Sequence, residues 1–143
     1  MAGRDFEITG YGIADWVWFG WQSEQLGDGS AVAMERIQSS VRVSAFELKI
    51  SDWKKAIRQA FRYSYFADLA VVVLPPETAG RAGKQIELFR ARGVALWSFD
   101  AKTDRIEKLY TPDKQEARSS LARRKAIELL VARSNLRKLR ETT

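Results

Sequence analysis

The sequence predicts an α/β domain in which a central mixed β-sheet is flanked by helices. Short apolar, β-branched runs alternate along the chain with stretches whose apolar residues recur at the helical period, a pattern typical of a parallel or mixed sheet covered by helices. The 143 residues suffice for one buried core, and no linker divides them. We therefore expect a single domain over residues 1–143, with a core at about 10–110 and a basic C-terminal helix at about 113–140.

Two strands are expected in the first third of the chain. Aromatic and β-branched residues predict them at Ala14–Trp21 and Val41–Ile50. The segment between them, residues 22–40, contains Gly27-Asp28-Gly29-Ser30, whose residue types favour a loop. Such a loop would be either a flap that faces a substrate or a mobile hairpin tip.

A helix is expected directly after the second strand. Ser51 is the expected N-cap, and the negative charge of Asp52 would interact favourably with the helix dipole. The residues that would face the core recur at the helical period; they are Trp53, Ile57, Ala60, Phe61 and Ser64.

The second half of the chain continues the alternation. Leu69–Leu74 is a short apolar run that ends at two prolines, which predicts a strand buried on both faces. Gly80–Ala91 is expected to be one helix that stops at Gly93. Strands are expected at Val94–Phe99 and, at an edge of the sheet, at Arg105–Tyr110.

A long basic helix is expected to run from Asp113 toward Arg140. Its apolar side would pack on the sheet, and its charged side carries eight basic residues: Arg118, Arg123, Arg124, Lys125, Arg133, Arg137, Lys138 and Arg140. A helix of this kind could grip a nucleic-acid backbone, lie on a membrane surface, dock to a partner, or simply keep its charges in water. Its few aromatic residues argue against membrane insertion.

Composition excludes several classes of chemistry. The chain has no cysteine and no histidine, so disulfides, thiolate or imidazole metal sites and His-based triads are excluded. A metal site would consist of oxygen ligands, which favours Mg²⁺ or Mn²⁺. The net charge of +6 suggests an anionic partner, with nucleic acid first. Without a signal peptide or an apolar run near the roughly 20 residues of a membrane span, we expect a cytoplasmic protein with no membrane partner.

The first candidate site is Glu47-Leu48-Lys49 on the second predicted strand. Because side chains alternate with period two, Glu47 and Lys49 should point to the same face. Charged groups among apolar neighbours are costly unless they are paired or bind a metal. A surface salt bridge is the alternative interpretation of this pair.

Three further side chains extend the candidate site. Asp15 lies at the start of the first predicted strand, where it could share a hard cation with Glu47 or serve only as a turn residue. Gln59 and Tyr63 lie one turn apart on one face of the predicted helix. We therefore take Asp15, Glu47, Lys49, Gln59 and Tyr63 as the candidate catalytic residues.

The same helix carries a row of basic residues. Lys54, Arg58 and Arg62 recur at i, i+4 and i+8, and Lys55 lies on the adjoining stripe. Like charges at this spacing repel each other, so the row is easier to understand if it faces a polyanion. The other interpretation is a solvated basic face.

Together these residues resemble the PD-(D/E)XK nuclease superfamily. The motifs stand here as Gly12-Ile13-Ala14-Asp15, then Glu47-Leu48-Lys49, then Gln59-x-x-x-Tyr63, and the last of these is similar to the RecB-like exonuclease branch. The resemblance covers roughly residues 10–74. It implies a restriction-endonuclease-like fold and a metal-dependent nuclease.

The resemblance also implies a role for each residue. Asp15 and Glu47 would bind Mg²⁺ or Mn²⁺, with the backbone carbonyl of Leu48 as a third ligand. Lys49 would orient or help to deprotonate the attacking water, while Gln59 would contact the metal-site residues or the scissile phosphate, supported by Tyr63. A metal, an activated water and stabilising cations are what phosphodiester hydrolysis requires.

We therefore expect a Mg²⁺-dependent nuclease that cleaves DNA, with RNA as a second substrate class, and Lys54, Lys55, Arg58 and Arg62 as nucleic-acid contacts. The alternative is a catalytically inactive module of the same fold that binds nucleic acid or protein. A third interpretation is an assembly protein whose basic helix mediates oligomerisation. The sequence alone is compatible with both a monomer and a homodimer.

Overall fold

The computed structural model describes residues 2–8, 12–21, 39 and 41–141. Within these residues, six strands form one mixed sheet, in the order β1-β2-β3-β4-β5-β6. The strands are β1 (Ala2–Ile8), β2 (Gly12–Trp21), β3 (Val41–Leu48), β4 (Leu69–Leu74), β5 (Ala95–Asp100) and β6 (Arg105–Tyr110). The helices are α2 (Trp53–Tyr63), α3 (Pro76–Gly83), α4 (Ile86–Arg92) and α5 (Ser120–Glu141). The expected α/β class with a mixed sheet is confirmed.

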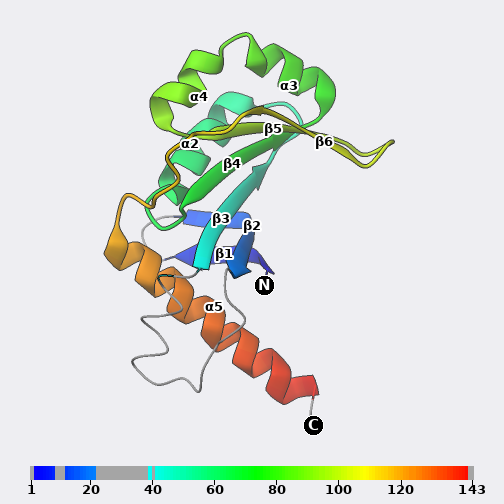
Figure 1. The fold of residues 1–143 in the computed structure, drawn as a ribbon. Helices are drawn as coiled ribbons and strands as arrows, with labels where there is room; N and C mark the ends of the chain where they lie inside the picture. The colour runs from blue at the N-terminus through cyan, green and yellow to red at the C-terminus, as the bar shows by residue number, and fades with distance from the viewer. Residues whose placement is uncertain (1, 9–11, 22–38, 40, 142–143) are drawn as a thin grey trace.

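The parallel part of the sheet lies at its centre. β3, β4 and β5 run parallel to one another, and the three outer pairings are antiparallel. α2 connects β3 to β4, and α3 and α4 connect β4 to β5 (Figure 1). The carboxyl ends of three strands therefore meet at one edge of the sheet.

The two faces of the sheet differ in what covers them. One face packs against all four helices, and its buried strand residues include Val17, Val43, Ala45 and Leu96. On the opposite face, a smaller cluster is centred on Val71 and consists of residues from the sheet alone among the described residues. Side chains alternate between the two faces along a strand. The helices therefore bury the face of β3 to which Ala45 and every second residue from it point.

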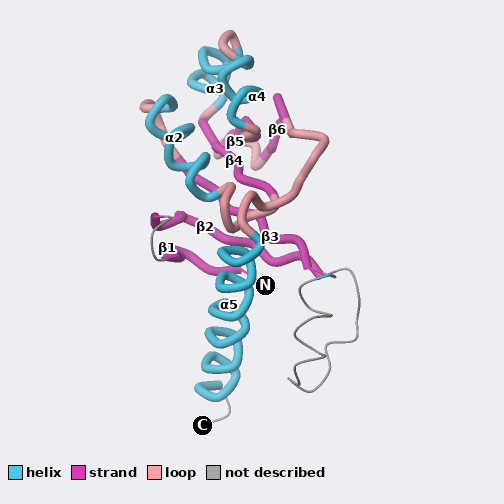
Figure 2. The backbone as a smooth tube through the Cα atoms, turned by 90° about the vertical axis from the view of Figure 1, so that its left-hand side faces the viewer, coloured by secondary structure: helices cyan, strands magenta, loops and turns pink. Residues whose placement is uncertain are grey.

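One carboxylate fixes α5 to the rest of the fold. Asp68, just before β4, accepts hydrogen bonds from the backbone N–H of Val43 at 2.9 Å and of Ala117 at 3.2 Å. It also forms an ion pair with Arg123 of α5 at 2.9 Å. Arg123 in turn donates to the backbone carbonyl of Val41 at the start of β3. Figures 1 and 2 show α5 extending from this anchor, away from α3 and α4.

Several predicted elements are confirmed. Leu69–Leu74 and Arg105–Tyr110 are strands with the expected bounds. The expected strand at Val94–Phe99 is observed one residue later, as β5. Gly93 ends α4 with a φ of 65°, the left-handed conformation that glycine adopts without strain. Residues 22–38 and 40 of the expected loop lie outside the described residues.

The expected helix at Gly80–Ala91 is wrong as a single element. The structure instead has α3 and α4, separated at Lys84 and Gln85. Pro76 at the first helical turn favours an earlier start than Gly80, and glycine at the end of α3 weakens its continuation. Likewise, Asp52 rather than Ser51 is the N-cap of α2, since its side chain accepts from the Lys55 N–H at 3.2 Å.

The C-terminal helix begins at Ser120, not at Asp113. In the segment before it, two backbone N–H groups donate to carbonyls directly after α2: Arg118 to Ser64 at 3.0 Å and Ser119 to Tyr65 at 2.9 Å. The Ser119 hydroxyl then accepts from the Ala122 N–H at 3.1 Å, an N-cap contact. Long-range partners therefore replace the helical hydrogen bonds that the sequence pattern predicted.

β1 was not expected from the sequence. Its only large apolar residues are Phe6 and Ile8, and the charged residues Arg4, Asp5 and Glu7 lie beside them in the sequence. Charges are common on strands at the edge of a sheet, where they discourage pairing with other chains. No helix in the described residues is both long and apolar enough to span a bilayer.

Candidate functional site

The pairing of β2 with β3 brings Asp15 next to Glu47. This antiparallel register ends with Trp16 paired with Phe46, so the next position sets Asp15 opposite Glu47. Residues directly opposite each other point to the same face of a sheet. The carboxylate of Asp15 accepts a hydrogen bond from the Leu48 N–H at 2.9 Å, which fixes it against the end of β3.

Glu47 is the buried centre of the candidate site. It is 2% exposed, on the same face of β3 as Val43 and Ala45. Its Oε2 accepts from the Tyr63 hydroxyl of α2 at 2.7 Å. Its Oε1 lies 3.6 Å from the Nζ of Lys49, whose side chain is 32% exposed. The expected common orientation of Glu47 and Lys49 is therefore observed, and the pair is half-buried rather than a surface salt bridge.

The electrostatics of Glu47 favour a cation. Burial raises the pKa of its carboxyl, and the negative charge of Asp15 raises it further; the Tyr63 hydrogen bond and the charge of Lys49 lower it, but not enough to cancel the rise. Burial also raises the pKa of Tyr63 well above its usual range, and its bond to Glu47 adds to this effect. Tyr63 is therefore a stable hydrogen-bond donor, and its bond together with the charge of Lys49 only partly compensates the ionised form of Glu47.

Gln59 adds an unused acceptor to this side of α2. It lies one turn before Tyr63, on the same helix face. Its Oε1 is buried and has no hydrogen-bond partner among the described residues. A buried polar atom without a partner is costly, and a ligand or its hydration water could satisfy this one.

The oxygen groups present fit a small divalent cation. Asp15 and Glu47 supply two carboxylates. The N–H and C=O of one strand residue point to the same side, so the Leu48 carbonyl is expected on the Asp15 side of β3. Among the described residues, no three acidic, histidine or cysteine side chains are placed so that they could hold a metal ion together, so a cation would also depend on such neutral oxygens. Oxygen donors suit Mg²⁺ or Mn²⁺, which retain several waters.

The basic row predicted on α2 is exposed along its whole length. Lys54, Lys55, Arg58 and Arg62 all lie on the solvent side of this helix. Lys54 lies over the Trp53 ring, with its Nζ 5.7 Å from the ring centre. The side chains of Lys55, Arg58 and Arg62 form no hydrogen bond or ion pair with the described residues. Their charges are thus available to a polyanion.

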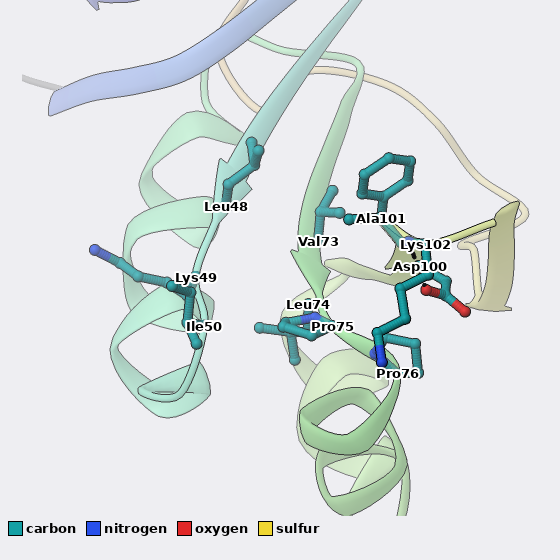
Figure 3. Close-up of a pocket in the computed structure, with 11 residues that line it drawn as sticks. Leu48, Lys49, Ile50, Val73, Leu74, Pro75, Pro76, Asp100, Ala101 and Lys102 are labelled. Atoms are coloured by element: carbon teal, nitrogen blue, oxygen red, sulfur yellow. Dashed lines mark hydrogen bonds between the residues drawn. The ribbon is translucent and has the colours of Figure 1, made fainter. Parts of the chain in front are cut away.

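A groove beside the site was not foreseen from the sequence. It has a volume of about 650 Å³ and lies at the carboxyl ends of β3, β4 and β5 (Figure 3). Leu48 and Ile50, which alternate with Glu47 and Lys49 along the chain, form one wall. The sequence signal that could have indicated the groove is the pair of apolar residues on either side of Lys49, which point to the face opposite Glu47.

The structure therefore brings Asp15, Glu47, Lys49 and Tyr63 together, and sets Gln59 one turn from Tyr63 on the same helix. Lys54, Lys55, Arg58 and Arg62 lie on the outer surface of that helix. No family model, no curated protein and no solved structure matched this chain.

Proposed function

We propose that this protein is a Mg²⁺-dependent nuclease with a PD-(D/E)XK active site on a restriction-endonuclease-like fold. The observation that carries the proposal is the convergence at Glu47. Asp15 comes from β2, Glu47 from β3, Lys49 from just after β3, and Tyr63 from α2. Three separate motifs thus supply the groups around one buried carboxylate.

Asp15, Glu47 and the Leu48 carbonyl would hold the metal. A bound Mg²⁺ or Mn²⁺ would supply Lewis-acid chemistry and stabilise the charge that develops on the phosphate. The raised pKa of Glu47 supports this assignment, because a divalent cation would offset the like charge of Asp15 and favour the ionised carboxyl.

The remaining side chains would position the reactants. The Lys49 ammonium, partly exposed and next to Glu47, would orient the attacking water and offset charge on the phosphate. In the reaction, the water oxygen forms a bond to phosphorus as a bridging P–O bond breaks, and the water proton ends on the leaving oxygen. Tyr63 would hold Glu47 in place, and the free acceptor of Gln59 would bind a water molecule of the site.

DNA is the proposed substrate because of the charge around the site. The exposed basic row of α2 extends along the same helix that supplies Tyr63. Phosphate contacts by lysine and arginine supply most of the affinity of sequence-independent nucleic-acid binding. Lys54, Lys55, Arg58 and Arg62 would hold the backbone while Lys49 faces the scissile phosphate.

A catalytically inactive binding module is the second candidate. The observation that favours it is the internal satisfaction of the site: Asp15 is bonded to the Leu48 N–H, and Lys49 is paired with Glu47. With only two carboxylates, such a site could be stable without metal. It would then retain nucleic-acid binding without turnover.

Cleavage assays with a matched lysine variant separate these candidates. Labelled single-stranded and duplex DNA would be incubated with the protein in Mg²⁺ or Mn²⁺, and in EDTA. We expect Lys49→Ala to lose at least about 100-fold in cleavage rate, the lower range for a positioned acid–base or electrostatic group. The control is Lys114→Ala, because Lys114 pairs with Glu116 at 3.7 Å but is 86% exposed.

Metal-dependent cleavage that Lys49→Ala abolishes and Lys114→Ala preserves would support the nuclease. Equal cleavage by both variants would contradict the assigned site. Salt-sensitive binding without cleavage in either metal would instead support the binding module.

A further inference from the structure

The groove next to the candidate site combines features that suit an unpaired base. Its apolar lining comes from Leu48, Ile50, Val73, Pro75 and Phe99. Three of these side chains are unusually exposed for large apolar residues: Leu48 is 52%, Ile50 is 82% and Phe99 is 39% exposed. Exposed apolar surface gathered in one groove commonly marks a binding site, and about 650 Å³ lies within the usual range of ligand pockets, about 300–1,000 Å³.

The position of the groove connects it to the proposed chemistry. It lies outside the carboxyl ends of the parallel strands β3, β4 and β5, where α/β sheets commonly bind ligands. Leu48 and Ile50 face the groove, and the side chain of Lys49 points away from the other labelled lining residues (Figure 3). The end of β3 thus separates an apolar side from a charged side that carries Glu47 and Lys49.

Two further polar residues line the groove across from this end of β3. Asp100 and Lys102 line the wall opposite Leu48 and Ile50 (Figure 3). The Asp100 carboxylate accepts the backbone N–H of Lys102 at 3.0 Å, so part of its acceptor capacity is used locally. The Lys102 ammonium adds positive charge at the rim. An apolar platform with flanking cations matches the chemistry of single-stranded nucleic acid, which presents a base face and a phosphate.

We propose that this groove holds an unpaired base of the DNA strand, stacked on Phe99, while the neighbouring phosphate lies at Lys49 on the other side of the end of β3. This inference rests on the proposed function and makes it more specific. Bases within a duplex are stacked on each other and cannot enter the groove, so the substrate is single-stranded DNA or a single-stranded end.

Binding without metal tests the groove independently of cleavage. Fluorescence anisotropy in EDTA would measure the affinity for a single strand, a duplex of equal length, and a strand of abasic spacers with the same number of phosphates. We expect wild type to prefer the single strand over the other two. Phe99→Ala should weaken single-strand binding at least about fivefold, the lower end for loss of one stacked base, and leave the binding of the duplex and the abasic strand unchanged.

The matched control is Trp18→Ala. Trp18 is 50% exposed, and it lies on β2, outside the groove. We expect this variant to bind the single strand like wild type. Ile50→Ala, which removes apolar contact but no aromatic ring, should give a smaller loss than Phe99→Ala. Circular dichroism would verify that each variant is folded.

Three results would overturn the inference: an unchanged single-strand affinity in Phe99→Ala, an equal loss for the abasic strand, or an equal loss in Trp18→Ala. These results are distinguishable from failure of the nuclease. Phe99-dependent binding without metal-dependent cleavage would refute catalysis and retain the groove. Cleavage that depends on Lys49, but with a single-strand affinity indifferent to Phe99, would retain catalysis and refute the groove.

Discussion

At the scale of single residues, Glu47 is the residue on which the proposed site depends. It is a buried carboxyl that receives one hydrogen bond from Tyr63 and lies 3.6 Å from Lys49. Burial and Asp15 nevertheless leave its pKa raised. A buried charge that is only partly compensated costs stability unless a ligand offsets it. The ionised carboxyl of Glu47 is therefore only partly compensated at the position where the proposed metal would bind.

This arrangement predicts a pH dependence of stability in the absence of metal. Above the usual pKa of a glutamate, the unfolded chain releases its proton while folded Glu47 retains it. The folded state then binds more protons, so the free energy of unfolding falls as the pH rises through the raised pKa. Urea titrations in EDTA at several pH values should show wild type losing stability relative to Glu47→Gln over this range.

The control for this experiment is Glu128→Gln, since Glu128 is an exposed glutamate paired with Arg124 on α5. Its stability difference from wild type should stay nearly constant over the same pH values. Added Mg²⁺ should stabilise wild type more at high pH than at low pH, because protons compete with the metal for Glu47. A difference between wild type and Glu47→Gln that does not change with pH would refute the electrostatic account.

At the scale of elements, the fold depends on contacts that no local pattern encodes. Asp68 joins the start of β3, the segment before α5 and α5 itself. Its side chain is 9% exposed and that of Arg123 is 19% exposed. Removal of one partner from a buried ion pair leaves the other charge uncompensated, which is more costly than the pair is stabilising.

Asp68→Ala should therefore destabilise the protein by about 3–5 kcal/mol, the usual cost of breaking a buried pair. We expect the loss in urea unfolding to coincide with faster amide exchange in the first turns of α5. Asp113→Ala removes an exposed aspartate from the same connecting segment and should change stability by less than about 0.5 kcal/mol. Comparable losses in both variants would show that Asp68 is not the anchor.

The same contacts explain which elements the sequence could predict. The common orientation of Glu47 and Lys49 follows from strand periodicity alone, and Leu69–Leu74 follows from its apolar run. The break between α3 and α4, and the start of α5 at Ser120, depend instead on glycine positions and on hydrogen bonds from Arg118 and Ser119 to distant residues. A helical pattern gives no information about such partners.

The candidate site, too, could be predicted from the sequence only in part. Its residue types were visible in the sequence, but Asp15 and Glu47 lie more than 30 positions apart along the chain, so only the β2–β3 register brings them opposite each other. The Tyr63–Glu47 bond depends on how α2 crosses the sheet. The groove depends on where three strands end, and the apolar residues on either side of Lys49 do not specify this by themselves.

At the scale of the whole molecule, two basic helices compete as the nucleic-acid surface. α2 supplies Tyr63 to the site, whereas α5 is anchored at Val41, at the opposite end of β3 from Glu47. Six residue steps along the strand separate these positions, about 20 Å. Arg124 of α5 is also paired with Glu128 at 3.1 Å, while Arg58 and Arg62 of α2 have no ionic partners among the described residues.

The salt dependence of DNA binding distinguishes the two helices. Each phosphate contact contributes about 0.9 to the slope of log K against log salt for duplex DNA and about 0.7 for single strands. We expect the double variant Arg58→Ala/Arg62→Ala to reduce that slope by one to two units and to weaken binding to all DNA sequences alike. The matched variant Arg124→Ala/Lys125→Ala should leave the slope nearly unchanged. A larger change in the α5 variant would mean that the DNA lies along α5, about 20 Å from the candidate catalytic residues, and would make the binding module the better assignment.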